Sequence, residues 1–190
     1  MANAQKGFTL LELMITLAVL VIGIAIAIPS FRGVLQSNRM TSQSNEMLTA
    51  LQLARSEAVN LRRSVSICPT NVNAFNAASP NCSDNWLEGW MIFVDTANPG
   101  SNSPAIGDVI RVSSRPRQDA TLTVNSATDF LRFLPNGRLD DVVLPSPPSG
   151  NQPRPTLAFN MTIPNCIGDA ARNIEVAPTG RTGVVRVQCE

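Results

Sequence analysis

The sequence predicts an α+β fold: a long N-terminal helix, membrane-spanning in its first half, packed on an antiparallel β-sheet head. Helix breakers are rare at the start. Of 14 prolines only Pro29 lies within residues 1–60, and of 11 glycines only Gly7, Gly23 and Gly33. Beyond that point short apolar runs alternate with turn residues. A helix followed by antiparallel strands is an α+β arrangement.

The composition removes the commonest catalytic tools. The 190 residues contain no histidine and no tyrosine, and 15 basic side chains balance 14 acidic ones for a net charge of +1. Histidine-based nucleophile activation and histidine-ligated metal sites are therefore absent. We expect no enzymatic activity, no metal and no cofactor.

Residues 8–28 form a nearly continuous apolar run, interrupted only by Thr9, Glu12, Thr16 and Gly23. As a helix this run would be about 31 Å long, which matches the hydrocarbon core of a bilayer. A helix that is apolar on every side cannot lie on the surface of a soluble protein. The run therefore predicts a transmembrane helix.

The alternative is a secretory signal peptide cut after Ala27, because Ala25-Ile26-Ala27 is an A-x-A-like end. Glu12 argues against it. A carboxylate inside a bilayer costs about 2.5–3.5 kcal/mol at the centre and less near an end, so it indicates a function and a cationic partner. Cleavage between Gly7 and Phe8 would place a new α-amino group one helical turn from Glu12.

The segment Lys6-Gly7-Phe8-Thr9-Leu10-Leu11-Glu12-Leu13 resembles the class III leader of type IV pilins and type II secretion pseudopilins. The resemblance implies that residues 1–7 are a leader, that a prepilin peptidase cuts after Gly7, and that Phe8 becomes N-methylated. It also implies that Glu12 registers the subunit in a growing fibre by pairing with an N-terminal amine. The protein would wait in the inner membrane, with its head in the periplasm, and then enter the extracellular filament.

Pro29 predicts a kink near residues 26–30, after which an amphipathic continuation of the helix should fill residues 29–62. Apolar side chains at spacings of four, three, four and three should pack on the head: Met47, Leu51, Ala54, Ala58 and Leu61. Residues 36–46 carry one large apolar side chain, Met40, and are expected to be solvated.

Residues 63–190 should form a β-rich globular domain. Seven segments read as strands: 64–68, 89–95, 108–114, 120–126, 131–134, 156–161 and 184–189. The proline-rich residues 145–155 should be an extended, mobile loop.

Several segments of this domain are similar to the GspH/FimT domain of minor pilins. They are Ala54–Ala58, Ser66–Pro69, Gly89–Asp95 and Phe133–Gly137. The resemblance to FimU-like subunits implies a minor pilin that helps prime assembly near the tip of a type IV pilus, with other minor and major pilins as partners. A type II secretion minor pseudopilin is the alternative within the same class.

Four cysteines without a C-x-x-C spacing argue against a zinc ribbon or a thioredoxin-like site. Lys6 before the apolar run favours a head outside the cytoplasm, where disulfides persist. Three pairings are possible. We favour Cys68–Cys82 with Cys166–Cys189, because each closes a loop within one end of the domain.

Two acidic turns are candidate ion sites. Asp95–Gly100 lacks the alternating oxygen ligands of a calcium loop, so we interpret it as a structural turn. The adjacent carboxylates of Asp140 and Asp141 are interpreted as a solvated turn rather than a catalytic pair.

Arg181 and Arg186 raise an alternative of another class, a DNA-binding minor pilin for DNA uptake. FimT-type uptake pilins carry a C-terminal Gly-Arg-x-Arg element. Gly180 and Arg181 match it here, but Gly183 occupies the position of the second arginine and Arg186 comes later. With Phe159 as the sole aromatic after residue 150, stacking platforms for bases are lacking. Nucleic acid is therefore the less favoured partner.

Overall fold

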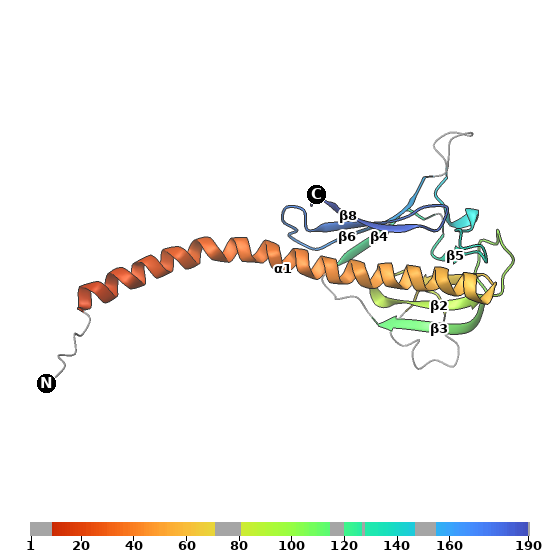
Figure 1. Ribbon diagram of the computed structural model, residues 1–190, viewed down its shortest axis with the longest axis horizontal. Coiled ribbons are helices and arrows are strands. Elements are labelled where there is room, and N and C mark those ends of the chain that lie inside the picture. The colour runs from red at the N-terminus through yellow and green to blue at the C-terminus, as the bar shows by residue number, and fades with distance from the viewer. Residues whose placement is uncertain (1–8, 71–80, 115–119, 127, 147–154, 190) are drawn as a thin grey trace.

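The computed structural model describes residues 9–70, 81–114, 120–126, 128–146 and 155–189. Its dominant element is helix α1 (Leu10–Leu61), 52 residues long. Figure 1 shows α1 as one gently curved rod whose first half projects away from the head. The helix starts where Thr9 caps it and ends at Arg62, which adopts a left-handed conformation with φ 53°.

Among the described residues, the part of α1 before residue 27 is exposed on every side. Twelve large apolar side chains within residues 10–26 are between 49% and 77% exposed. The helix continues through Pro29 without a break, so the kink expected there is only a gradual bend (Figure 1). Within the described residues this is the one helix long and apolar enough to cross a membrane.

The head consists of two antiparallel four-stranded sheets. The first has the order β3-β2-β1-β5 and the second the order β4-β6-β7-β8. The strands of the first sheet are β1 (Val65–Pro69), β2 (Gly89–Asp95), β3 (Ile106–Ser114) and β5 (Leu131–Phe133). Those of the second are β4 (Thr121–Val124), β6 (Leu157–Thr162), β7 (Ala171–Val176) and β8 (Thr182–Val187). Two short 3-10 helices, η2 (Trp86–Glu88) and η3 (Asp141–Val143), complete the head.

All seven expected strands are present, and β7 is an eighth that the sequence did not predict. Its inward positions are Arg172, Ile174 and Val176, all buried. The arginine at the first of these positions hides the apolar alternation that marks a half-buried strand. The expected mobile loop at 145–155 lies largely outside the described residues.

Helix α1 runs between the two sheets and shares one core with both of them (Figure 1). Four of the five expected stripe residues are fully buried: Met47, Leu51, Ala54 and Ala58. Leu61 is the exception, at 46% exposed, because the chain leaves the helix at the next residue. The rings of Trp86 and Phe159 meet edge to face at 5.2 Å and link η2 to the second sheet.

The expectation that residues 36–46 are solvated holds for one face of the helix, where Asn38, Arg39, Ser42, Asn45 and Glu46 are exposed, and was wrong for the other face. Met40 is fully buried, and Ser44 and Gln43 are 1% and 9% exposed. The second sheet extends far enough towards the membrane-side half of α1 to cover this stretch. Polar side chains can be buried where they form hydrogen bonds, as Ser44 Oγ does by donating to the carbonyl oxygen of Thr41 at 3.0 Å.

Two disulfides fasten the head, Cys68–Cys82 and Cys166–Cys189, which are the pairs that the sequence favoured. The first ties β1 to the segment that precedes η2. The second ties the segment after β8 to the β6–β7 connection, and the Cys189 N–H also donates to the Gly168 carbonyl oxygen at 2.9 Å. The C-terminal strand is thereby held close to the end of the chain, where fraying would otherwise begin.

The packing of α1 against the sheets can be tested with Leu51→Ala. Removal of this fully buried side chain should lower the free energy of unfolding by about 2–5 kcal/mol. Leu61→Ala is the matched control on the same helix and should cost less than about 1 kcal/mol. Thermal unfolding of the detergent-solubilised chain, followed by the fluorescence of the buried Trp86 and Trp90, measures both. Equal losses in the two variants would contradict the packing described.

Candidate functional site

The N-terminal end of α1 contains the candidate site for processing and assembly. Glu12 is the only ionisable residue in the apolar run and is exposed in the isolated chain. Its backbone N–H donates to Thr9 Oγ1 at 3.2 Å, which makes Thr9 the helix cap and puts Glu12 in the first turn. The partial positive charge of the helix N-terminus favours a carboxylate there. Gly7 and Phe8 lie outside the described residues.

A side-chain amide joins α1 to the C-terminal disulfide loop. Gln36 Nε2 donates to the carbonyl oxygen of Asn165 at 3.1 Å, and the N–H of Ile167 donates to Gln36 Oε1 at 3.2 Å. These two bonds flank Cys166, one half of the second disulfide. The head is therefore attached to α1 within eight residues of the apolar run's end at residue 28.

A buried arginine makes a second attachment one turn further along α1. Arg172 on β7 is 2% exposed, and its Nη2 donates to Ser37 Oγ at 3.0 Å and to Thr41 Oγ1 at 2.9 Å. Its Nη1 donates to three successive carbonyl oxygens of residues 169–171 at 2.8–2.9 Å. Burial lowers the pKa of Arg172, and the neighbouring Arg186 guanidinium lowers it further. An arginine nevertheless stays protonated, so these oxygens solvate a permanent charge.

A second buried arginine organises the opposite end of the head. The Nε atom of Arg132 is 2.8 Å from Asp95 Oδ2, its Nη1 is 3.1 Å from Asp140 Oδ2, and all three side chains are buried. The guanidinium also donates to carbonyl oxygens of the β2–β3 connection, those of Ser101 at 3.0 Å and Ser103 at 3.2 Å. One guanidinium therefore pairs with two carboxylates and fixes a long loop.

The two carboxylates accept further bonds from inside the head. Asp95 accepts from Ser66 Oγ at 2.6 Å and from the N–H groups of Ala97 and Ala105, both at 2.9 Å. These internal donors fit the interpretation of residues 95–100 as a structural turn. For Asp140 the expectation of a solvated turn was wrong, since it is 4% exposed and accepts from the Gly100 N–H at 2.8 Å.

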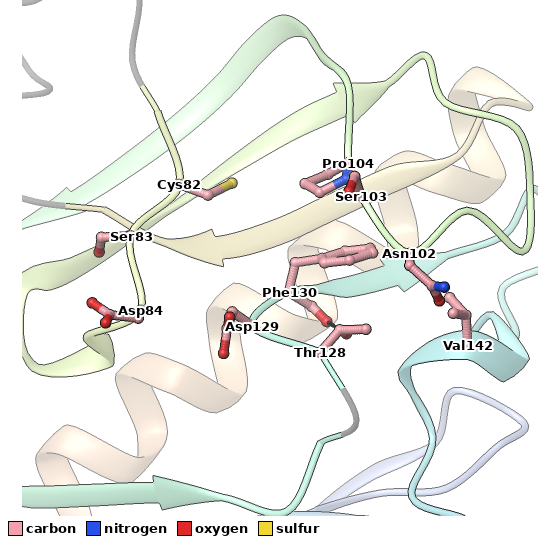
Figure 2. A pocket seen from close by; sticks show the side chains of 10 residues that line it. All are labelled: Cys82, Ser83, Asp84, Asn102, Ser103, Pro104, Thr128, Asp129, Phe130 and Val142. Atoms are coloured by element: carbon pink, nitrogen blue, oxygen red, sulfur yellow. Dashed lines mark hydrogen bonds between the residues drawn. The ribbon is translucent and has the colours of Figure 1, made fainter.

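A groove of the described head lies beside this network, with a volume of about 750 Å³. Figure 2 shows the Phe130 ring in its middle, with Ser83 and Asp84 to one side and Asn102 to the other. The ionisable side chains that line it are Asp84 and Asp129, and its one cysteine, Cys82, is bound in a disulfide. Such a lining offers neither an activated nucleophile nor a metal-binding set, and no cluster of three metal ligands occurs among the described residues.

The structure does not bring Arg181 and Arg186 together. Arg181 is exposed at the start of β8 beside the C-terminal part of α1, whereas Arg186 is exposed near the other end of β8, opposite Arg172. Five residues of extended chain separate them by roughly 17 Å. They do not form one compact phosphate-binding pair.

Comparison with known proteins identifies the family. The profile described as "Type II transport protein GspH" matches residues 43–180, and that of the prokaryotic N-terminal methylation motif matches residues 2–28. The chain belongs to the GspH family. The two matches together cover the apolar run to residue 28, α1 from residue 43 onward and most of the head.

Similar proteins come from bacterial pili. The type IV major fimbrial protein FimA of Dichelobacter nodosus is 30% identical over 163 residues, which are 75% of this chain and 99% of FimA. A crystal structure of the type IV minor pilin FimU of Pseudomonas aeruginosa PAO1 superposes with a TM-score of 0.53 and 25% identity, over 78% of this chain and 89% of FimU. A second crystal form of FimU gives 0.51 and 26%, over 76% and 91%.

These matches establish what kind of protein the chain is. It has the pilin fold, and the pilin family consists of structural, non-enzymatic proteins. The methylation motif implies processing by a prepilin peptidase, and membership of the family implies other pilins as partners. A prepilin with an exposed apolar helix is consistent with residence in the inner membrane and then in a pilus.

The buried network around Arg132 can be tested with Arg132→Met. The variant leaves Asp95 and Asp140 buried without their cation, so it should lose about 3–5 kcal/mol of stability. Arg138→Met, at an exposed position in the turn that follows β5, is the control and should change stability by less than about 0.5 kcal/mol. Thermal unfolding of the two detergent-solubilised variants decides between them. A stability loss no greater than that of the control would contradict the role given to Arg132.

Proposed function

We propose that this protein is a minor pilin of a type IV pilus, a structural subunit that helps prime pilus assembly near the tip. It is held in the inner membrane by residues 8–28, with the head in the periplasm, until it enters the extracellular fibre. The observation that carries the proposal is the uncovered apolar half of α1, which continues directly into a head similar to that of FimU.

The exposed apolar half of α1 requires an environment other than water. Its exposed apolar side chains form a surface far larger than the few hundred Å² that monomeric soluble proteins expose. Lipid satisfies this requirement before assembly, because the apolar run is as long as a bilayer core is thick. Equivalent helices of neighbouring subunits satisfy it afterwards, because they supply the same apolar contacts in the filament.

Glu12 supplies register in an otherwise uniform surface. Apolar contacts are non-directional and do not distinguish one axial position from the next. A carboxylate in an apolar setting is stabilised strongly only where a cation meets it. The methylated amine of Phe8, created by cleavage after Gly7, is a suitable cation because it stays positively charged and is only four positions from Glu12 in the sequence.

Known relatives favour a pilus over a secretion filament. FimA and FimU are both described as type IV pilus proteins, whereas the description of the family profile refers to type II transport. A type II secretion pseudopilin therefore remains the second candidate. Deletion of the gene separates the two: a pilus subunit is required for surface pili, and a pseudopilin for release of periplasmic proteins to the medium.

Gly7→Val should block maturation, because a peptidase that cuts after a glycine must fit a residue without a side chain beside the scissile bond. The variant is expected to retain residues 1–7 and to be missing from sheared pili. Ala4→Val introduces the same side chain three positions earlier and should be processed normally. Intact-mass spectrometry of the membrane fraction reads the N-terminus of each. Cleavage at Phe8 in the Gly7→Val variant would contradict the assignment.

Glu12→Ala should lower the recovery of the chain in sheared pili by about tenfold or more, since it removes the charge that selects register. The head should keep its unfolding temperature. Glu46→Ala changes an exposed carboxylate on the same helix outside the apolar run and is the control. Quantitative immunoblots of pili and membranes measure the ratio. Wild-type recovery of the Glu12 variant would reject the registration role.

A further inference from the structure

A second groove, of about 520 Å³, lies beside the C-terminal end of α1. One wall is a single face of α1 between Gln52 and Asn60, and Arg181 and Thr182 form the other wall. Arg55 and Arg181 are its only ionisable lining residues, so the groove carries two positive charges and no negative one.

The two arginines play different parts. Arg55 is fixed, because its Nε donates to the Gly137 carbonyl oxygen at 3.0 Å and its Nη2 donates to the Thr179 carbonyl oxygen at 3.4 Å. The turn after β7 is pressed against the same place, since a Cβ at Gly180 would collide with the Gly137 carbonyl oxygen. Arg181 is exposed, and its carbonyl oxygen accepts from the Ala177 N–H at 2.8 Å, but its guanidinium makes no hydrogen bond or ion pair with the described residues.

The surroundings of the groove strengthen its positive potential. Exposed arginines follow the end of α1 and the turn at Gly137: Arg62, Arg63 and Arg138. The nearest acidic residues along the chain are Glu57 on α1, Asp140 and Asp141 after the Gly137 turn, and Glu175 on β7, and none of them lines the groove. Apolar surface is close by, with Val59 in the groove 48% exposed and Leu61 at its end 46% exposed.

We propose that this groove binds an acidic segment of the neighbouring pilin subunit, with a carboxylate of that segment paired with Arg181. The proposal rests on the filament role given above. Guanidinium groups bind carboxylates in a bidentate manner, and arginine mixed with exposed apolar side chains is typical of protein–protein contact surfaces. Successive subunits of a helical filament meet through two different surfaces. The acidic segment can therefore come from a part of the neighbouring subunit that does not correspond to this groove.

Protein is a better match than nucleic acid for this groove. A strand of nucleic acid is bound along an extended basic track with aromatic platforms for its bases. Here the lining is short, contains no aromatic residue and includes the apolar Val59. Arg186, the other arginine considered for DNA, lies outside it.

The test uses the full-length chain in piliated cells, with the photo-crosslinking residue p-benzoylphenylalanine in place of the exposed Asn60. Irradiation should join the groove to a pilin peptide that contains Asp or Glu, identified by mass spectrometry. Arg181→Glu should lower the yield of this product about tenfold, and Arg181→Lys by less. Arg186→Glu, the same charge reversal outside the groove, should leave the yield within about twofold.

An exchange of charges between Arg181 and its acidic partner is the decisive experiment. Replacement of the identified acidic residue by Arg should restore crosslinking to the Arg181→Glu variant. An unchanged yield in that variant, a crosslinked peptide without a carboxylate, or crosslinks to DNA that disappear with Arg181→Glu would each overturn the proposal. These results would leave the filament role intact, whereas absence of the wild-type chain from pili would reject both.

Discussion

The apolar half of α1 is the constraint on which the rest of the molecule depends. Its described side chains at residues 10–26 stay exposed in the folded chain, whereas one face of the same helix is buried in the head from Met40 onward. Water is a poor environment for so much apolar surface, so its burial must come from lipid or from other subunits. In the proposed function, membrane residence and filament assembly both supply that burial, and Glu12 makes the filament contact specific.

The head must move as one body with this helix if it is to take a defined place in a filament. Three sets of interactions provide that rigidity. The core joins α1 to both sheets, and the bonds from Gln36 and Arg172 hold the second sheet against the polar stretch closest to the apolar run. At the far end, Arg132 fixes the β2–β3 connection. The position of α1 in the fibre therefore determines the position of the head's surfaces.

The same rigidity couples the groove beside Arg181 to α1. Its walls come from α1 and from the β7–β8 turn, and Arg55 joins them through bonds to two separate loops. A contact made there is transmitted to the helix without an intervening hinge. Assembly would then combine a non-directional apolar contact along the helices with a charged contact at the end of the head.

The sequence predicted those features that follow from local pattern. Breaker distribution gave the long helix, alternation and turn residues gave seven strands, and loop closure gave both disulfides. The failures share one physical cause, which is the burial of polar residues with partners distant in sequence. Arg172 interrupts the apolar alternation of β7, so this strand was not predicted. The same side chain donates to Ser37 and Thr41, which lie on either side of the buried Met40 in the sequence. Asp140 looked solvated because its cation, Arg132, is on a different element.

The candidate site also has one part that a local segment predicted and another that it did not. Gly7, Phe8 and Glu12 were predicted from the resemblance of one short segment to a class III leader, because the cleavage and registration proposed for them act on a linear segment. The groove was not predictable, since Arg55 and Arg181 are 126 positions apart and meet only when the β7–β8 turn packs on α1. Arg181 was noticed for a different reason, its place in a short C-terminal motif.

The most direct test of the central claim is the intact mass of the wild-type chain recovered from purified pili. A chain that uses its apolar helix for assembly should begin at Phe8, carry one added methyl group and retain everything up to residue 190. A polypeptide that begins beyond Ala27, without the apolar helix, would contradict the account.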